Sequence, residues 1–360
     1  MFSRWRYRSS FALDSPLFPV RATSDGTSRK NPAGAGTGHA SARAQKCQRV
    51  FGFDGEGPRG ELVATVRRRL VIVLLVPGLF GCLFAEDRVV SLAPSVTETI
   101  LALGLEARII GRTRYCPGAD REGAVIFEDM VQPSVERLIG LRPDLILTSD
   151  PTPEAVVTQL RRMGLRVERL VTSDLGSVAT NLRPVGELLG QRARAETLAN
   201  RVLKQIEAVE RVTGEVAEGK RPRVVLFYGT NPEFCAGAGS FTGEILERAG
   251  GHNVAADADS AWPSLSRERL MSWDPEVVLI SLTENPVDLA AARATVSRWK
   301  GDALWNRLSA VRSGRIVFIT GSLLMIPGPR VGEAAEAVAR ALYPDLFPAE
   351  ATSELHFLEP

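Results

Sequence analysis

QRARAETLANRVLKQIEAVERVTGEVAEG, residues 191–219, is the stretch that decides the fold. It contains no proline and is rich in Ala, Glu, Arg, Lys and Leu, which favour helix. Its apolar residues recur at steps of three, four and seven, as expected along one helix face: Leu198, Val202, Ile206, Val209 and Val216. Gly219 and Pro222 supply the expected end. At 1.5 Å per residue, the helix would be on the order of 40 Å long, about the width of a domain.

The segments before and after this helix resemble each other. Three blocks recur in the same order: RVVSLAPS (88–95) with RVVLFYGT (223–230), TETILALG (97–104) with TGEILERAGG (242–251), and VERLIGLRPDLILTS (135–149) with RERLMSWDPEVVLIS (267–281). In the last pair, Glu136 and Glu268 each stand seven residues before a proline. Repeated blocks in one order indicate a duplicated architecture. The long helix is therefore expected to join two similar lobes.

Within each lobe, short β-branched runs alternate with amphipathic segments at the spacing of βα units. This pattern predicts an α/β protein with mostly parallel sheets in two lobes, one connecting helix, and a ligand cleft between the lobes. Ligands of such sheets bind outside the carboxyl ends of the strands. The expected organisation is an N-terminal lobe at 87–185, the connecting helix at 186–221, a C-terminal lobe at 222–348 and a tail at 349–360.

The first 86 residues differ in composition from the rest. Residues 1–60 carry a net charge of +6 without apolar periodicity, so they are expected to be disordered or an artefact of the gene model. The basic run Arg67–Arg69 precedes the apolar run LVIVLLVPGLFGCLFA (70–85). Basic residues followed by a short apolar core have the layout of an export signal, here over 61–86. A single-pass anchor is the alternative interpretation.

Leu79-Phe80-Gly81-Cys82 resembles a bacterial lipobox, in which the cysteine is acylated and becomes the mature N-terminus. Cleavage after Ala85 is the competing prediction. In both cases we expect the protein in the periplasm or at the outer cell surface, with a lipid on Cys82 in the first case only.

Composition and motifs argue against several functions. The chain from Leu70 onward has a net charge of −6, which disfavours nucleic acid as a partner. The three histidines of the full chain are scattered, so no metal site is expected. No nucleophile–base motif occurs, and the glycines of CAGAGSFTGE (235–244) miss dinucleotide-binding spacing. We therefore predict no catalytic residue, no cofactor and no enzymatic activity. Cys116 and Cys235 are expected to be separate thiols.

Two loop aromatics, Tyr115 and Trp262, occur one in each predicted lobe. Aromatic residues facing each other across a crevice between domains commonly form small-molecule sites. Glu136 and Glu268 occupy matched positions and suggest a two-pronged acidic surface for a partner that presents Arg or Lys.

The ordered set of these motifs resembles a known family. RVVSLAPSVTETILALG, the YCP loop at 115–117, PSVERLIGLRPDLIL, GGHNV, AWPSLSRERL and PGPR are similar to periplasmic binding proteins of cobalamin and iron-siderophore importers. The similarity extends over about residues 87–345 and is greatest to the vitamin B12-binding branch. It implies two lobes on a single backbone helix and the role of substrate-binding component of an ABC importer.

The resemblance also implies roles for individual residues. Cobalamin or a related corrinoid would contact Pro94, Ser95, Tyr115 and Trp262 in the cleft. Arg330 of PGPR would touch a polar group of the ligand or, alternatively, only cap its own loop. The paired glutamates Glu136 and Glu268 would dock onto arginines of a membrane permease dimer served by a cytoplasmic ATPase. The binding protein itself is expected to be a monomer.

The sequence departs from the family at two places. Ser322–Met325 replaces aromatic and acidic residues before the final helix, and IFEDMVQPS (126–134) lacks a tryptophan found in some cobalamin binders. Haem and ferric siderophores are therefore alternative ligands, and a haem protein would use Tyr115 as an axial ligand. An enzyme acting on such a ligand in the same cleft is a third hypothesis.

Overall fold

The computed structural model describes residues 88–118, 123–172, 174–231, 233–282, 287–347 and 355–357. The predicted segments 1–60 and 61–86, with the lipidation candidate Cys82, lie outside these ranges. Among the helices of the described ranges, none is both long enough and apolar enough to cross a membrane.

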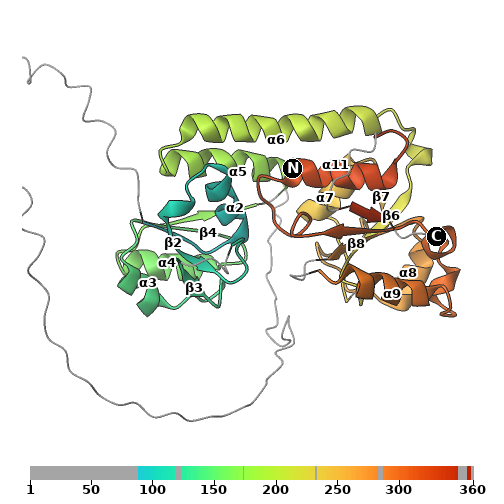
Figure 1. Ribbon diagram of the computed structural model, residues 1–360, viewed down its shortest axis with the longest axis horizontal. Helices are drawn as coiled ribbons and strands as arrows, with labels where there is room; N and C mark the ends of the chain where they lie inside the picture. The colour runs from blue at the N-terminus through green and yellow to red at the C-terminus, as the bar shows by residue number, and fades with distance from the viewer. Residues whose placement is uncertain are drawn as a thin grey trace, which may run out of the picture. The chain divides into compact units, whose positions relative to one another are not determined.

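The first lobe contains a five-stranded parallel sheet in the order β3-β2-β1-β4-β5 (Figure 1). Its strands are β1 (Val89–Ser91), β2 (Ile109–Thr113), β3 (Val125–Phe127), β4 (Leu145–Ser149) and β5 (Val167–Leu170). Its helices are α2 (Pro94–Ala102), η1 (Glu106–Arg108), α3 (Val135–Leu141), α4 (Glu154–Arg162) and α5 (Leu175–Leu188). Residues from α2 and α5 cover one face of the sheet, and residues from α3 and α4 cover the other. Burial on both faces explains why these strands read as continuous apolar runs.

The second lobe repeats this plan, with the sheet order β10-β9-β8-β6-β7. Its strands are β6 (Arg223–Tyr228), β7 (His252–Asn253), β8 (Val277–Leu282), β9 (Ile316–Thr320) and β10 (Leu355–Phe357). Its helices are α7 (Phe241–Arg248), α8 (Arg267–Trp273), α9 (Leu289–Trp299), η3 (Trp305–Arg307), α10 (Ser309–Ser313) and α11 (Val331–Leu342). The segment expected to be a tail at 349–360 contributes β10, which pairs antiparallel with β9. The second sheet thus extends beyond the boundary predicted at residue 348.

The duplication is visible in matching details of the two lobes. The orders β2-β1-β4-β5 and β7-β6-β8-β9 place equivalent strands at equivalent positions. The side chains of Ser134 and Ser266 cap α3 and α8 in the same way, each accepting a hydrogen bond from the third helical N–H. Both helices end at a residue in the left-handed region, Arg142 with φ 47° and Asp274 with φ 39°. The predicted α/β fold with two similar, mostly parallel lobes is confirmed.

The connecting helix is shorter than predicted. It is α6 (Arg192–Thr213), and it ends at Gly214 rather than at Gly219. The Thr213 hydroxyl is 3.1 Å from the Arg248 carbonyl oxygen at the end of α7, so the last turn of α6 is held against the second lobe. Gly214, a poor helix former, follows directly after Thr213. The chain then turns through η2 (Glu218–Lys220) to enter β6. Val216, predicted on the apolar face, lies beyond the helix.

A single apolar cluster joins the two lobes. Figure 1 shows α6 running along α5 and α11, and these three helices contribute to one core. The cluster includes Val89 of the first sheet, Val224 of the second sheet, and Leu198, Val202 and Ile206 of α6. Since this core is continuous, separating the lobes would expose apolar surface, which is unfavourable. The structure therefore favours small relative movements of the lobes.

Gly186 determines how closely α5 approaches α6. A Cβ atom at Gly186 would lie 2.1 Å from the Ala195 Cβ and 3.1 Å from the Gln191 carbonyl oxygen. Gly186→Ala is therefore expected to lower the free energy of unfolding by about 2–3 kcal/mol, the cost of overpacking a close contact. Gly140→Ala is a matched control, because a Cβ at this position in α3 has nothing within 4 Å. Alanine there is expected to raise stability by up to about 1 kcal/mol.

Urea denaturation of the two variants and the unchanged protein measures this difference. A Gly186→Ala protein as stable as the unchanged one would show that α5 and α6 are not in the close contact described here.

Candidate functional site

The predicted ligand residues Pro94 and Ser95 lie at the carboxyl edge of the first sheet. They are the first two residues of α2 and are half-buried. Proline suits this position, because the first N–H of a helix has no partner within the helix. The Ser95 Oγ lies 3.4 Å from the Ser149 Oγ at the end of β4. The loop after β1 and the end of β4 therefore meet where parallel sheets bind ligands.

The loop after β2 presents Tyr115 and buries Cys116. Tyr115 is 43% exposed, and the Arg114 guanidinium lies 5.7 Å from the centroid of its ring. The Cys116 Sγ is 3.1 Å from the Thr113 Oγ1 and 3.8 Å from the Ser91 carbonyl oxygen. Burial raises the pKa of Cys116, so the thiol stays protonated at neutral pH. Cys116 thus anchors the loop, while Tyr115 keeps an accessible aromatic face.

In the second lobe, Trp262 stands on an aromatic support that the sequence analysis missed. Trp262 is 39% exposed and meets Tyr228 edge-on, with ring centroids 5.5 Å apart. Tyr228 also packs against Phe234, with ring centroids 5.8 Å apart. The Tyr228 hydroxyl donates to the Thr242 Oγ1. Burial raises the pKa of Tyr228, so this phenol remains neutral. An aromatic residue at the very end of the strand RVVLFY was the available signal for this support.

Arg330 joins the two lobes. It precedes α11, and its Nη2 donates to the Glu98 Oε1 at 3.0 Å and to the Ser322 Oγ at 2.8 Å. Glu98 belongs to α2 of the first lobe and is only 8% exposed. Burial raises the pKa of Glu98, and the neighbouring Arg330 opposes this effect. The sequence analysis missed this ion pair, for which the only signal was a charged residue inside the apolar run TETILALG. A ligand contact of Arg330 stays a prediction.

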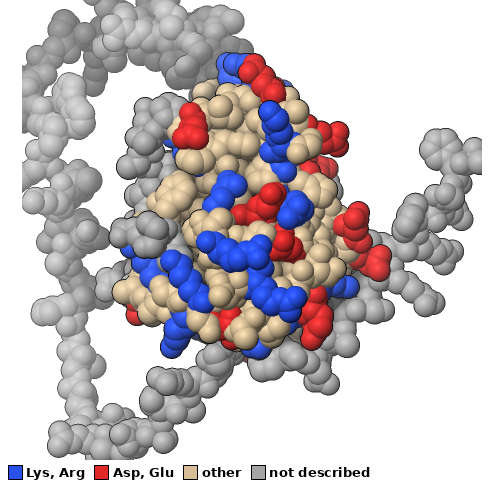
Figure 2. Space-filling view, turned by 90° about the vertical axis from the view of Figure 1, so that its right-hand side faces the viewer, with Lys and Arg blue, Asp and Glu red and all other residues tan. Residues whose placement is uncertain are grey.

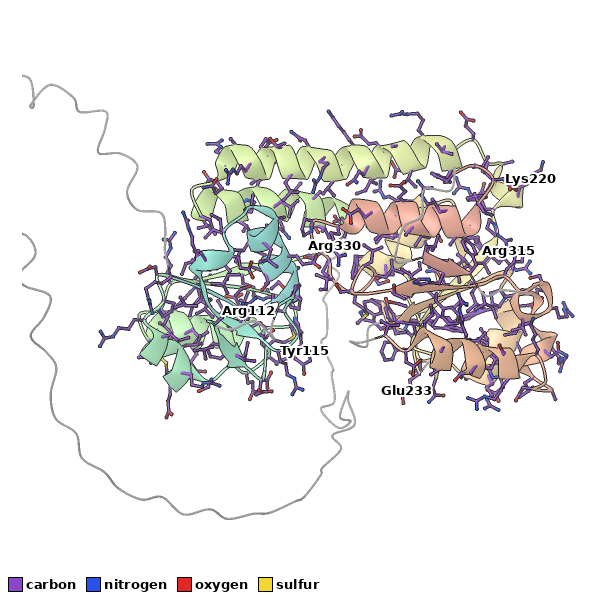
Figure 3. The ribbon with its side chains drawn as sticks, in the orientation of Figure 1. Arg112, Tyr115, Lys220, Glu233, Arg315 and Arg330 are labelled. Carbon is purple, nitrogen blue, oxygen red and sulfur yellow. The ribbon has the colours of Figure 1, made fainter. Side chains whose placement is uncertain are left out.

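Figure 3 shows where the predicted contacts stand. Tyr115 lies on the side of the first lobe that faces the second lobe, and Arg330 lies between the lobes near α11. Pro94 and Ser95 share α2 with Glu98, so the Glu98–Arg330 pair brings them toward the start of α11. Trp262 belongs to the second lobe. The candidate ligand residues are thus contributed by both lobes, as predicted.

The candidate docking residues occupy equivalent positions. Glu136 and Glu268 are both exposed, and each is the second residue of its helix, α3 or α8. A carboxylate in the first turn is stabilised by the helix dipole. Hydrogen bonds from its own backbone N–H and from Ser266 lower the pKa of Glu268, so it stays ionised at neutral pH. Each lobe therefore presents one exposed negative charge at the same structural position.

A pocket of about 410 Å³ lies elsewhere, within the second lobe. It is bordered by the start of α8, the end of α9 and the stacked rings of Trp299 and Trp305, whose centroids are 3.9 Å apart. None of the five predicted ligand contacts lines it. Within the described ranges, no group of three or more His, Cys, Asp or Glu side chains is placed to hold a metal ion.

The outer end of the second lobe carries grouped basic side chains with acidic ones among them (Figure 2). Lys220 and Arg315 are at this end (Figure 3). The Arg315 Nη2 donates to the Leu342 carbonyl oxygen at the end of α11, where a cation stabilises the helix terminus. The amino ends of β6 and β9 lie here. This basic surface is therefore on the opposite edge of the sheet from the strand ends that bind ligands.

Residues 89–323 match the family model for periplasmic binding proteins. The chain belongs to this family. It is 30% identical over 263 residues to a cobalamin-binding protein from Halobacterium salinarum, covering 71% of this chain and 69% of the relative. A vitamin B12-binding protein from Salmonella choleraesuis is 29% identical over 223 residues, covering 61% of this chain and 81% of the relative.

A solved structure of a heme binding protein has a similar fold. The periplasmic heme binding protein from Pseudomonas aeruginosa superposes with a TM-score of 0.64 at 27% identity, covering 76% of this chain and 98% of that one. The resemblance to periplasmic binding proteins predicted from the motifs is confirmed, and the relatives include binders of both cobalamin and haem.

Proposed function

We propose that this protein is the substrate-binding component of an ABC importer and captures cobalamin or a related corrinoid outside the cytoplasm. The observation that carries the proposal is the pair of exposed aromatic residues, Tyr115 and Trp262, one on each lobe of a periplasmic binding protein fold. A corrinoid is broad and flat, and aromatic faces on two lobes suit such a ligand. The named relatives that bind cobalamin support the same choice.

The proposed mechanism is capture and delivery. The lobes would hold the ligand at their strand ends, and the loaded protein would dock onto a permease dimer through Glu136 and Glu268. ATP hydrolysis by the cytoplasmic partner would then drive import. The relatives named above are binding proteins, which supports binding as the function. Export through residues 61–86, a lipid on Cys82 and a monomeric state belong to the same proposal.

Haem is the second candidate ligand. The Pseudomonas aeruginosa relative named as a heme binding protein motivates it. The exposed phenol of Tyr115 offers an oxygen ligand for haem iron. A haem complex would give an intense visible absorbance band that changes on Tyr115→Phe, whereas a cobalamin complex has no need of the Tyr115 oxygen.

Calorimetric titration with cobalamin, haem and a ferric siderophore tests the proposal. We expect heat with cobalamin, and about a tenfold loss of affinity for Trp262→Ala and for Tyr115→Ala, because each removes a stacking face. Phe357→Ala is a matched control, since Phe357 is an equally exposed aromatic on the edge strand β10. Binding of haem or the siderophore without any heat or thermal shift from cobalamin would overturn the proposed ligand.

A further inference from the structure

Arg112 is a buried cation at the carboxyl edge of the first sheet. It is the fourth residue of β2, only 3% exposed, and its side chain makes one hydrogen bond, from Nη1 to the Pro117 carbonyl oxygen at 3.1 Å. Its Nε is buried and has no hydrogen-bond partner. Within the described ranges, no carboxylate forms an ion pair with Arg112. Burying an unpaired charge is costly, so this arrangement calls for an explanation.

Neighbouring guanidinium groups do not share this property. Two arginines near the same edge of the first lobe have carboxylate partners, Arg114 with Glu128 and Arg169 with Asp150, and Arg330 of the second lobe pairs with Glu98. Each of these three guanidinium groups thus has a carboxylate partner, whereas Arg112 has the Pro117 carbonyl oxygen as its acceptor.

The groups around Arg112 are neutral. Ser91 and Ile126 face it across the sheet, and Thr113 and Cys116 follow it along the chain. Burial raises the pKa of the Cys116 thiol, although Arg112 acts in the opposite direction, so no thiolate forms to balance the guanidinium. None of these described neighbours supplies a counter-charge for Arg112.

We propose that Arg112 receives an anionic oxygen of the bound ligand. This inference rests on the proposed function and specifies which ligand group enters the first lobe. Cobalamin offers its phosphodiester and haem offers a propionate carboxylate, and a guanidinium recognises both kinds of oxyanion.

The position of Arg112 fits this role. It lies at the base of the loop that exposes the Tyr115 ring (Figure 3), so a ring plane on Tyr115 would bring a polar substituent toward Arg112. The hydrogen bond to Pro117 restrains this loop in the absence of ligand. Binding would exchange the neutral carbonyl acceptor for a charged one, and charge-assisted hydrogen bonds are the stronger kind.

The test combines Arg112→Gln and Arg112→Met with ligands that differ in charge. We expect each variant to lose about 10- to 100-fold in affinity for cobalamin, the effect of losing a hydrogen bond to a charged group. Its affinity for cobinamide, which lacks the phosphate and the nucleotide, should change by less than about threefold, within ordinary mutational variation. The phosphate-bearing cobinamide phosphate should respond as cobalamin does. For haem, the dimethyl ester replaces cobinamide as the uncharged comparison.

A second readout separates a binding role from a structural one. Without ligand, Arg112→Met should be at least as stable to urea as the unchanged protein, because it removes an unpaired buried charge. A residue kept only for structure would lower stability and weaken all ligands equally. Arg161→Gln is the control, because Arg161 of α4 is an exposed arginine of the same lobe with its own carboxylate partner, Glu154. It should leave affinity unchanged and change stability little.

The outcomes distinguish the two proposals. If the unchanged protein binds neither cobalamin nor haem, the proposed function fails. If it binds cobalamin and the Arg112 variants bind it equally well, the role of Arg112 is wrong. If the Arg112 variants do not fold, the inference is tested on the unchanged protein alone, by comparing its affinities for ligands with and without the anionic group. Equal affinities for cobinamide and cobinamide phosphate, and for haem and its ester, overturn the inference.

Discussion

Replacing both Glu136 and Glu268 by alanine is expected to reduce cobalamin uptake to the background level while leaving ligand affinity unchanged. Both carboxylates are exposed in the first turns of equivalent helices, so their removal leaves the ligand residues in place. Losing one charge-assisted contact with an arginine at an interface costs about 2 kcal/mol or more. Two such losses, if additive, would weaken docking by about 1,000-fold or more. The single variants should retain intermediate uptake.

Uptake of labelled cobalamin in cells and calorimetry on the purified protein measure the two sides of this prediction. Glu207→Ala with Glu218→Ala is the matched control, because it removes the same charge from exposed positions in α6 and η2. That control should transport normally. Normal uptake by the Glu136 and Glu268 double variant would show that docking uses another surface. A parallel loss of ligand affinity would place the two glutamates in the binding site instead.

The lobes and the docking positions were predictable from the sequence because they rest on local patterns. The repeated blocks fixed the equivalent strands and placed Glu136 and Glu268 at matched sites, and both helices indeed start with a serine cap two residues earlier. The amphipathic stretch recognised from residue 191 begins one residue before α6, whereas the predicted boundary at residue 186 falls inside α5. These signals lie in the local sequence and do not depend on tertiary contacts.

Features that depend on packing escaped prediction. Pro184 lies inside α5, although proline in a helix interior is normally unfavourable. α5 is nevertheless helical along its length and packs against α6. α6 ends early because its last turn is docked on the second lobe. β10 is a three-residue edge strand and exists only through pairing with β9.

The candidate site likewise contains residues that were predictable from local sequence and residues whose role depends on packing. Tyr115 and Trp262 were recognisable as loop aromatics, and the structure places both with exposed faces. The Glu98–Arg330 pair joins residues 232 positions apart, and no local pattern links them. Arg112 reads in sequence as one polar residue among several at a strand end, and only its burial distinguishes it.

The Glu98–Arg330 pair leads to the second prediction with a large effect: its two partners should contribute unequally to stability. Arg330→Gln is expected to lower the free energy of unfolding at pH 7 by about 2–4 kcal/mol, because it leaves a buried carboxylate unpaired. Since the Arg330 side chain is 34% exposed, the expected loss of unfolding free energy lies toward the lower end of the losses seen when a buried ion pair is broken. Glu98→Gln should be neutral or stabilising, since a neutral amide avoids the desolvation of the carboxylate.

The direction of the pH dependence follows from the raised pKa of Glu98. The folded protein binds the proton more tightly than the unfolded chain, whose carboxyl has a pKa near 4.5. Stability is therefore greatest below the unfolded value and is lost as the pH rises through the folded pKa. Arg330 lowers this folded pKa, so Arg330→Gln raises it further and extends the sensitive range upward.

Urea denaturation between pH 5 and pH 7 separates the four proteins: the unchanged one, each single variant and the double variant. The deficit of Arg330→Gln should shrink as the pH falls, because protonation neutralises the unpaired carboxyl. Adding Glu98→Gln to Arg330→Gln should restore most of the lost stability at pH 7, because no buried charge then remains. Arg114→Gln, which breaks an exposed pair with Glu128, should cost less than about 1 kcal/mol. Equal losses from both single variants with no recovery in the double variant would mean that the ion pair itself, rather than the burial of Glu98, decides the energetics of this junction between the lobes.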